Sequence, residues 1–325
     1  MSSFEPPPSD EDVDGLGIKA LRELIVSAGL SHADCVEKSD LRARAKLATA
    51  KLRDAPASSA AGGGAAAGAG AGTAGAAAGG GALVEEELTL GPYSCVARLP
   101  APGAAPPELV VVLLHGLGAT KHDLVPLFDA LAARPPLAGR RLALVCPGAP
   151  ARAGGAMWWD LNLGQWMGAW MQGEAALAPL LRTKFAGVDD ARAGVRALVD
   201  AAARRCGVEP GRVMLGGFSQ GAMTALDCAL SGPRGGVAGV TALSGAPIDV
   251  DHWAGRLRAE HKGLRVLVTH GRADATLPFA VSGWLDQLLR GGGADVRYVP
   301  HGGAHDVGDE AVLRAIADFW ASLIP

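Results

Sequence analysis

The stretch that decides the fold is Val213-Met214-Leu215-Gly216-Gly217-Phe218-Ser219-Gln220-Gly221, which carries the pattern G-x-S-x-G from Gly217 to Gly221. An apolar run precedes the serine, and the helix-prone segment Ala222–Leu230 follows it. A serine in this strand–turn–helix setting is typical of a nucleophile elbow, where small flanking residues permit a tight turn. We expect the turn to raise Ser219 to the carboxyl edge of a sheet, at the N-terminus of a helix.

Short apolar segments recur on both sides of this motif, separated by amphipathic stretches such as Val188–Arg205 and Ala311–Leu323. Short strands alternating with helices predict an α/β protein with a mostly parallel central sheet and helices on both faces. Together with the elbow, this indicates the α/β-hydrolase fold. The predicted strands are an opening pair over Leu88–Leu99 broken at Gly91-Pro92, then Leu109–Leu114, Leu142–Cys146, Arg212–Gly216, Gly239–Leu243, Arg265–His270 and Val296–Val299.

An elbow serine requires an acid and a histidine further along the chain, in that order. Asp274 follows the predicted strand at Arg265–His270, and His305 follows the strand at Val296–Val299. Both therefore belong to the sheet edge where Ser219 is expected. We predict that His305 is the base and that Asp274 orients it. His301 and Asp306 are the second choices.

The segment His115-Gly116-Leu117-Gly118 closes the first core strand. Its glycines allow the backbone to turn so that an N–H points into the site. With the N–H of Gln220, this would form an oxyanion hole. We expect His115 to be structural and to pack below the loop.

These segments resemble the acyl-protein thioesterases and related phospholipase/carboxylesterases, in family order over about residues 85–325. The resemblance implies a Ser219–Asp274–His305 triad, oxyanion donors from the N–H groups of Leu117 and Gln220, and a substrate that is an acyl ester or thioester, such as an S-acylated protein. The chain departs from the family at Gly221-Ala222, at Ala275-Thr276-Leu277 and most at Gln165–Lys184, which shapes the acyl pocket in the family. The matching stretches are Leu113–Gly118, Pro147–Pro150, Trp158–Leu161, Gly207–Gly221, Leu243–Gly245, His270–Pro278 and Gly303–His305.

The divergent segment contains Trp166 and Trp170, and Met167 and Met171, each pair four residues apart. One interpretation is an apolar lid or acyl channel lined by wide, soft side chains. The other is a helix that faces the core. The spacing fits both.

Before this domain lies a small helical unit at residues 13–54. Asp34-Cys35-Val36-Glu37-Lys38-Ser39-Asp40 resembles the SAP-like C-terminal domain of the mesencephalic astrocyte-derived neurotrophic factor family, which implies an interaction module with a protein partner. Ser39 is the expected N-cap of its second helix. His32 stands where that family has a second cysteine, so a C-x-x-C redox role is not expected. The basic residues of the second helix favour a solvated face over contact with nucleic acid or anionic membranes.

An Ala/Gly-rich stretch, residues 55–82, separates the two parts and is expected to be a flexible linker. Although uncharged from residue 60, its Ala and Gly gain too little on leaving water to form a membrane span. A net charge of −3 gives no general reason for nucleic-acid or membrane binding. The five scattered cysteines and the acidic start predict a cytoplasmic protein with reduced thiols.

No Cys/His group has metal-ligand spacing, and the predicted chemistry uses neither metal nor organic cofactor. We therefore expect a serine esterase or thioesterase acting through an acyl-enzyme, most like the acyl-protein thioesterases. A general carboxylesterase or lysophospholipase would use the same triad. A non-catalytic adaptor protein is the alternative from another class.

Overall fold

The computed structural model describes residues 13, 21, 24–26, 28, 38–54, 83–152 and 155–325. It divides into two compact units, residues 1–73 and 74–325. In the first, α3 (Lys38–Asp54) and a small buried cluster of Val13, Leu21, Ile25 and Ala45 are described. The prediction that Ser39 caps this helix is wrong, because the helix already begins one residue earlier. Cys35 and the Ala/Gly-rich stretch lie outside the described residues.

An eight-stranded sheet forms the centre of the second unit, in the order β1-β2-β4-β3-β7-β8-β9-β10. Strand β2 pairs antiparallel with both β1 and β4, and all remaining pairs are parallel. The mostly parallel sheet expected from the sequence is therefore present. The strands are β1 (Leu83–Leu90), β2 (Tyr93–Pro100), β3 (Leu109–Leu114), β4 (Leu142–Pro147), β7 (Val213–Phe218), β8 (Gly239–Leu243), β9 (Arg265–Gly271) and β10 (Asp295–His301), and a separate small pair joins β5 (Ala151–Arg152) to β6 (Gly155–Ala156).

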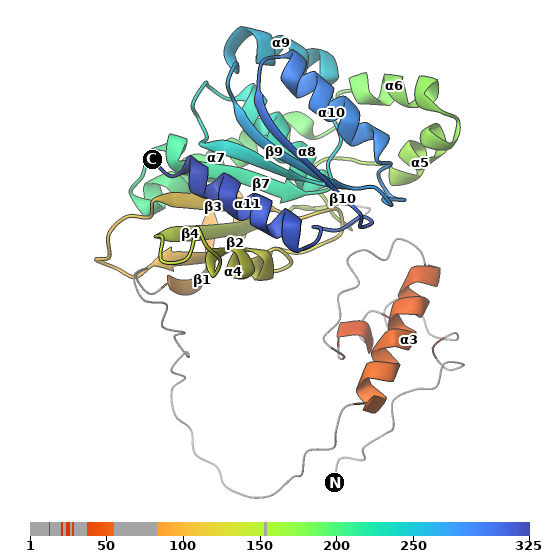
Figure 1. The fold of residues 1–325 in the computed structure, drawn as a ribbon, viewed down its shortest axis with the longest axis horizontal. Helices are drawn as coiled ribbons and strands as arrows, with labels where there is room; N and C mark the ends of the chain where they lie inside the picture. Colours follow the sequence, from red (N-terminus) through yellow and green to blue (C-terminus); the bar gives the residue numbers. More distant parts are fainter. Residues whose placement is uncertain are drawn as a thin grey trace, which may run out of the picture. The chain divides into compact units, whose positions relative to one another are not determined.

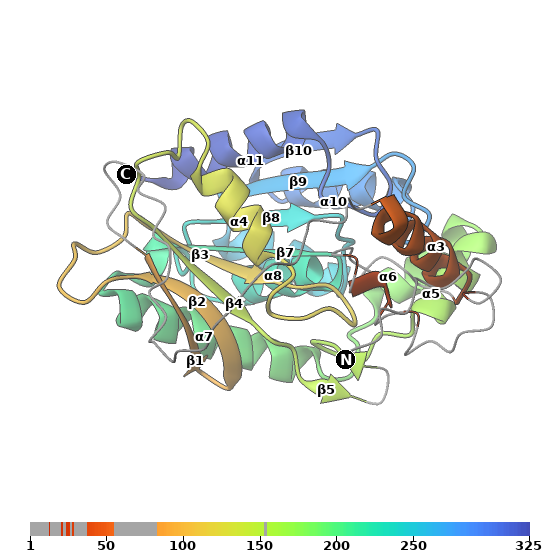
Figure 2. The same ribbon diagram turned by 90° about the horizontal axis from the view of Figure 1, so that it is seen from below.

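Helices cover both faces of this sheet, which is why its central strands are apolar at every position (Figures 1 and 2). The α4 and α11 helices pack on one face, and α7, α8, α9 and α10 pack on the other. Their bounds are α4 (Val125–Ala132), α7 (Val188–Cys206), α8 (Gln220–Ser231), α9 (Val250–Glu260), α10 (Ala280–Gly291) and α11 (Glu310–Leu323), with a 3-10 turn, η1, at Pro210–Arg212.

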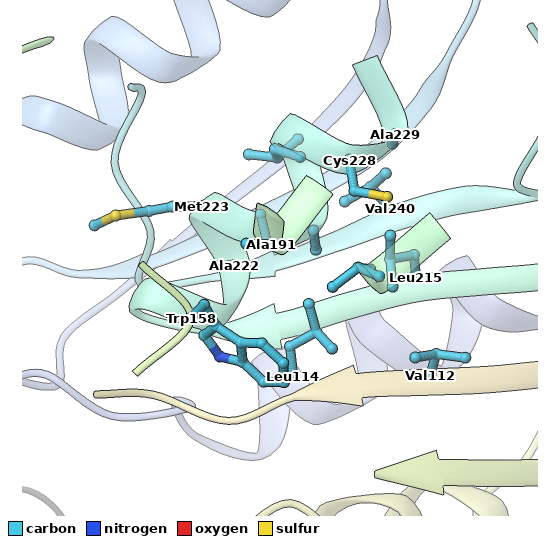
Figure 3. Close-up of a cluster of buried hydrophobic side chains, with 14 of the residues drawn as sticks. Val112, Leu114, Trp158, Ala191, Leu215, Ala222, Met223, Cys228, Ala229 and Val240 are labelled. Atoms are coloured by element: carbon cyan, nitrogen blue, oxygen red, sulfur yellow. The ribbon is translucent and has the colours of Figure 1, made fainter. Parts of the chain in front are cut away.

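Strand β3 shows how one segment serves two cores. Val110, Val112 and Leu114 enter the layer beneath α7 and α8, whereas Leu109, Val111 and Leu113 enter the layer beneath α4 and α11. This alternation is the two-residue period of a strand. Figure 3 shows part of the first layer, where Val112 and Leu114 share buried space with Trp158 and with Cys228 of α8. Each fully buried Val or Leu contributes roughly 1.5–3 kcal/mol to folding.

Because β3, β7, β8, β9 and β10 run parallel, the loops after them meet at one edge of the sheet. Leu114 pairs with Gly217, Phe218 with Leu243, and Pro300 with His270, so these strand ends lie side by side. Helices α5 (Leu163–Met171) and α6 (Glu174–Arg182) lie at the same edge (Figures 1 and 2). No helix within the described ranges is long and apolar enough to cross a membrane.

Candidate active site

Ser219 forms the turn between β7, which ends at Phe218, and α8, which begins at Gln220. The strand–turn–helix setting predicted for it is present. Its backbone has φ 54° and ψ −120°, a conformation that a residue with a side chain rarely adopts. Its N–H donates a 2.8 Å hydrogen bond to the carbonyl of Leu243. The surrounding sheet thus holds a strained conformation of the kind that concentrates at functional sites, and this strain costs roughly 1–3 kcal/mol.

The glycines of the elbow are required by backbone contact. A Cβ atom on Gly221 would lie 2.0 Å from the carbonyl oxygen of Leu114, and one on Gly217 would lie 2.5 Å from the carbonyl carbon of Gly221. The start of α8 therefore packs directly on the end of β3, which no larger residue would permit.

His115 supports the loop after β3, as expected from the sequence. Its ring is buried, Nε2 accepts a 3.0 Å hydrogen bond from the N–H of Ala149, and Nδ1 lies 2.8 Å from the carbonyl of Gly116. Burial lowers the pKa of His115, although the bond to Gly116 opposes that shift. Trp158 Nε1 donates to the His115 carbonyl at 2.8 Å. A neutral, fully engaged imidazole here is structural.

The backbone N–H groups of Leu117 and Gln220 are the predicted oxyanion donors. In the described part of the chain, the N–H groups of Leu117 and Gln220 donate no hydrogen bond, whereas the neighbouring Gly118 N–H donates to Ala156 at 2.8 Å. Gln220 opens α8, and the first N–H groups of a helix have no partner within it. Its buried side chain is held between the Trp158 N–H (3.0 Å) and the Trp159 carbonyl (2.8 Å). Neither predicted oxyanion donor is therefore hydrogen-bonded to another described residue, and their role stays a prediction.

Asp274 and His305 are in direct contact. Asp274 Oδ2 lies 2.6 Å from His305 Nδ1, and Oδ1 accepts hydrogen bonds of 2.8 Å from the N–H groups of Thr276 and Leu277. Burial alone would raise the pKa of Asp274, but hydrogen bonds from His270, His305 and Leu277 outweigh it and hold that pKa well below its usual value. Asp274 is thus an ionised carboxylate able to fix an imidazole.

The His305 ring also packs on Phe218, the residue before Ser219, with ring centroids 4.8 Å apart. His305 is thereby held against the residue that precedes Ser219. Within the described residues no hydrogen bond joins Ser219 to His305. Such bonds are often long before substrate binds.

The second choices, His301 and Asp306, shape the loop that carries His305. Asp306 Oδ2 accepts from the Ala304 N–H at 3.1 Å, and His301 Nδ1 accepts from the Gly303 N–H at 3.2 Å. This loop lies directly over Gly271, where a Cβ atom would be 2.0 Å from the Ala304 carbonyl oxygen. Neither second choice contacts Asp274.

A cavity of about 140 Å³ lies beside the acid. Trp166 is almost fully buried and its ring lies 6.3 Å from that of Phe185, while Met171 is 85% exposed. Helix α5 therefore packs on the core with Trp166 and also lines the cavity, while its use as an acyl channel stays a prediction. The cavity is lined by Trp166, Met167, Trp170 and Met171 of α5, Leu177 of α6, and Ala275, Thr276 and Pro278 after the acid.

Residues 101–324 match the family model described as phospholipase/carboxylesterase. The chain belongs to the phospholipase/carboxylesterase family. The crystal structure of esterase PE8 is similar at 25% identity and a TM-score of 0.55, over 74% of this chain and 99% of that one. A carboxylesterase from Mesorhizobium loti matches at 21% identity and 0.55, over 73% and 98% of the two chains. Arabidopsis thaliana SOBER1 matches at 20% and 0.52, over 67% and 99%. The last two show the α/β-hydrolase fold alone. Family and fold together make the protein an ester hydrolase.

The family match begins after the first unit, so it leaves the proposed SAP-like module at residues 13–54 a prediction. Nor do three or more His, Cys, Asp or Glu side chains come together as a metal site in the ranges that the structure describes. The four described cysteines are free and buried.

The protein also has a larger cavity of about 430 Å³, which lies away from Ser219, toward the other end of the strands. Its walls include η1 and the turn before β8, at the amino ends of the strands. Chemistry in open α/β sheets occurs at the carboxyl ends. We therefore assign the site to the smaller cavity beside Asp274.

One residue of this site was not predicted from the sequence to contact the acid. His270 places Nε2 3.2 Å from Asp274 Oδ2. The sequence shows that His270 lies four residues before Asp274. It does not show that the loop turns Asp274 back onto His270.

Proposed function

We propose that this family member is a serine hydrolase in which Ser219, His305 and Asp274 form the catalytic triad. The observation that carries the proposal is the 2.6 Å contact between His305 Nδ1 and Asp274 Oδ2, at the sheet edge where Ser219 stands in a strained turn. This arrangement supplies a nucleophile, a base and an orienting carboxylate in the chain order of α/β-hydrolases.

In the proposed mechanism, Ser219 Oγ attacks the acyl carbonyl carbon while His305 Nε2 takes the hydroxyl proton. Asp274 holds the imidazole in the tautomer with a proton on Nδ1 and stabilises the imidazolium. The N–H groups of Leu117 and Gln220 donate to the oxyanion. The tetrahedral intermediate expels the alcohol or thiol, which receives the proton from His305. Water activated by His305 then releases the acid and restores Ser219.

We infer that the acyl group occupies the cavity formed by Trp166, Met167, Trp170 and Met171. An apolar hollow next to the acid of the triad is the setting that an acyl chain requires. By resemblance, an acyl-protein thioesterase-like activity is the leading choice. A general carboxylesterase or lysophospholipase is the second, and is distinguished by turnover of a palmitoyl thioester, a lysophospholipid and short acyl esters side by side.

Labelling with a fluorophosphonate tests the triad. The full chain should be labelled, and Ser219→Ala should lose both the label and roughly 10⁴–10⁶ of kcat. His305→Ala should come close to that loss, and Asp274→Asn should cost about 10⁴. Because the residues act as one unit, Ser219→Ala/His305→Ala should be no slower than Ser219→Ala alone. A folded Ser219→Ala protein with unchanged turnover would exclude the covalent mechanism. A full chain that neither labels nor hydrolyses esters would favour an adaptor.

A further inference from the structure

Asp274 is contacted by a second histidine that the triad does not include. His270 is the penultimate residue of β9 and has no exposed surface. Its Nε2 lies 3.2 Å from Asp274 Oδ2, the same oxygen that His305 Nδ1 reaches at 2.6 Å. One carboxylate oxygen therefore faces two imidazoles, one from β9 and one from the loop after the neighbouring β10.

The acceptors around His270 define where its proton lies. Nε2 faces Asp274 Oδ2 and, at 2.7 Å, the carbonyl oxygen of Leu277, neither of which can donate. Nε2 must therefore carry hydrogen. Nδ1 is buried without a partner. A second proton there would be an unpaired donor on a buried cation, which is costlier than an unpaired lone pair. The neutral Nε2–H tautomer fits this site.

The same ring also closes the loop after the acid. The Leu277 carbonyl accepts from His270, while the Leu277 N–H donates to Asp274 Oδ1 at 2.8 Å. Three other residues of this loop, Ala275, Thr276 and Pro278, line the cavity beside the site. His270 thus ties the carboxylate and the cavity wall to a rigid strand.

All groups that face the Asp274 carboxylate come from three places. His270 belongs to β9, His305 follows β10, and the N–H groups of Thr276 and Leu277 belong to the acid's own loop. No other titratable side chain of the described residues is within hydrogen-bond or ion-pair distance of this carboxylate. His301 and Asp306 contact the His305 loop but not the acid.

We propose that His270 is a positioning residue for the triad: its Nε2–H, which donates to the Leu277 carbonyl and lies 3.2 Å from Asp274 Oδ2, fixes the carboxylate and moderates the negative charge that His305 experiences. The proposal rests on the proposed function of Ser219, His305 and Asp274. Without the His270 donor, Asp274 would rotate more freely and present a less neutralised oxygen to His305. A protonated His305 would then be favoured up to a higher pH, which leaves less of the base active.

His270→Asn provides the test, since an Asn amide reaches only as far as the Nδ1 position and cannot place an N–H beside the Leu277 carbonyl and Asp274 Oδ2. The kcat for a short acyl ester should fall roughly 10- to 100-fold, as for loss of a hydrogen bond to a charged group. KM should stay within about threefold, since substrate does not contact His270. The acid limb of the kcat/KM profile should move to higher pH by roughly half a unit or more. His270→Gln has an amide nitrogen that reaches the Nε2 position, so it should restore most of the kcat and most of the wild-type position of the acid limb.

A matched control exists in His301, which is buried at the end of the adjacent strand and contacts no triad member. In His301→Asn an oxygen at the Nδ1 position can still accept from the Gly303 N–H, so rate and acid limb should stay near wild type. Each rate is divided by the concentration of active sites, which is measured by titration with fluorophosphonate. A fraction of unfolded protein then does not lower the apparent kcat. If His270→Asn does not fold, His270→Met takes its place as the test. Its side chain fills the space of the ring but has no N–H donor, and the same changes in kcat and acid limb are expected.

A His270→Asn enzyme with the wild-type rate and acid limb would overturn the proposal. So would an equal change in His301→Asn, or a His270→Gln enzyme as impaired as His270→Asn, because either indicates a merely structural ring. Failure of the proposed function has a different signature: the wild-type chain would not be labelled, or Ser219→Ala would retain its rate.

Discussion

Asp274 shows at the residue scale how a buried charge is kept in place. A carboxylate without exposed surface is unstable unless its oxygens are hydrogen-bonded. Two backbone N–H groups satisfy Oδ1, and two imidazoles face Oδ2. The acid is therefore built into its loop, and its orientation does not depend on His305 alone.

Gly221 gives a prediction at the same scale. In Gly221→Ala the new methyl group would lie 2.0 Å from the carbonyl oxygen of Leu114, where neither backbone can yield. Overpacking commonly costs 1–3 kcal/mol, and we expect a loss of about 3 kcal/mol or more in unfolding free energy. Urea or thermal unfolding measures it, together with loss of fluorophosphonate labelling because the elbow is displaced.

Gly283 supplies the matched control, because a Cβ atom there meets nothing within 4 Å. It lies inside α10, where alanine is favoured over glycine by roughly 0.5–1 kcal/mol. Gly283→Ala should therefore preserve labelling and slightly raise stability. A Gly221→Ala protein as stable and reactive as wild type would contradict the close packing of α8 on β3.

The sequence allows a prediction for residues that belong to a known motif or that directly follow a predicted strand. Ser219 follows from G-x-S-x-G, and the strands before Asp274 and His305 assign both residues to the elbow's edge. The His270–Asp274 contact depends on how the loop at 274–278 turns back, which local patterns do not encode. Nor could the sequence decide between core and cavity for Trp166, since a 3.6-residue period shows that a face is apolar but not what covers it.

At the scale of elements, helix α5 limits what the cavity can hold. About 140 Å³ is close to an apolar cavity of about 150 Å³ that holds one benzene molecule, so roughly six carbon atoms fit. Trp170 lines this space and is only partly buried. Removal of its indole should therefore enlarge the cavity at less expense to the core than removal of the buried Trp166.

We predict that the full chain prefers acyl esters of about four to six carbons, which would favour the general carboxylesterase over the acyl-protein thioesterase-like activity, and that Trp170→Ala shifts this optimum to longer chains. One methylene in an apolar pocket changes the barrier by roughly 1–3 kcal/mol, which makes the shift readily measurable. The measurement is kcat/KM over p-nitrophenyl esters from acetyl to palmitoyl. Gln172→Ala, just beyond the same helix and not lining this cavity, is the control. If kcat/KM depends on acyl length in Trp170→Ala as it does in the wild type, the cavity is not the acyl site.

At the scale of the whole molecule, the proposed catalytic apparatus belongs to one unit. The proposed triad, both proposed oxyanion donors and the cavity residues lie between Leu117 and His305, within the 74–325 unit and the 101–324 family match. The sheet also begins within this unit, since β1 starts at Leu83 and pairs along its length with β2. We therefore expect the proposed reaction to need none of residues 1–82.

A protein of residues 83–325 should hydrolyse a small ester with a kcat/KM within about threefold of the full chain, less than 1 kcal/mol in the barrier. The comparison uses p-nitrophenyl butyrate at equal titrated site concentration, with Ser219→Ala in both lengths to subtract background. Thermal unfolding establishes that the short protein is folded. A short protein that unfolds cooperatively yet has lost the reaction would show that residues 1–82 complete the site. Equal rates would indicate that residues 1–82 act in the choice of a partner or of a larger substrate. A comparison of the full chain with the 83–325 protein on an S-acylated protein would test that role.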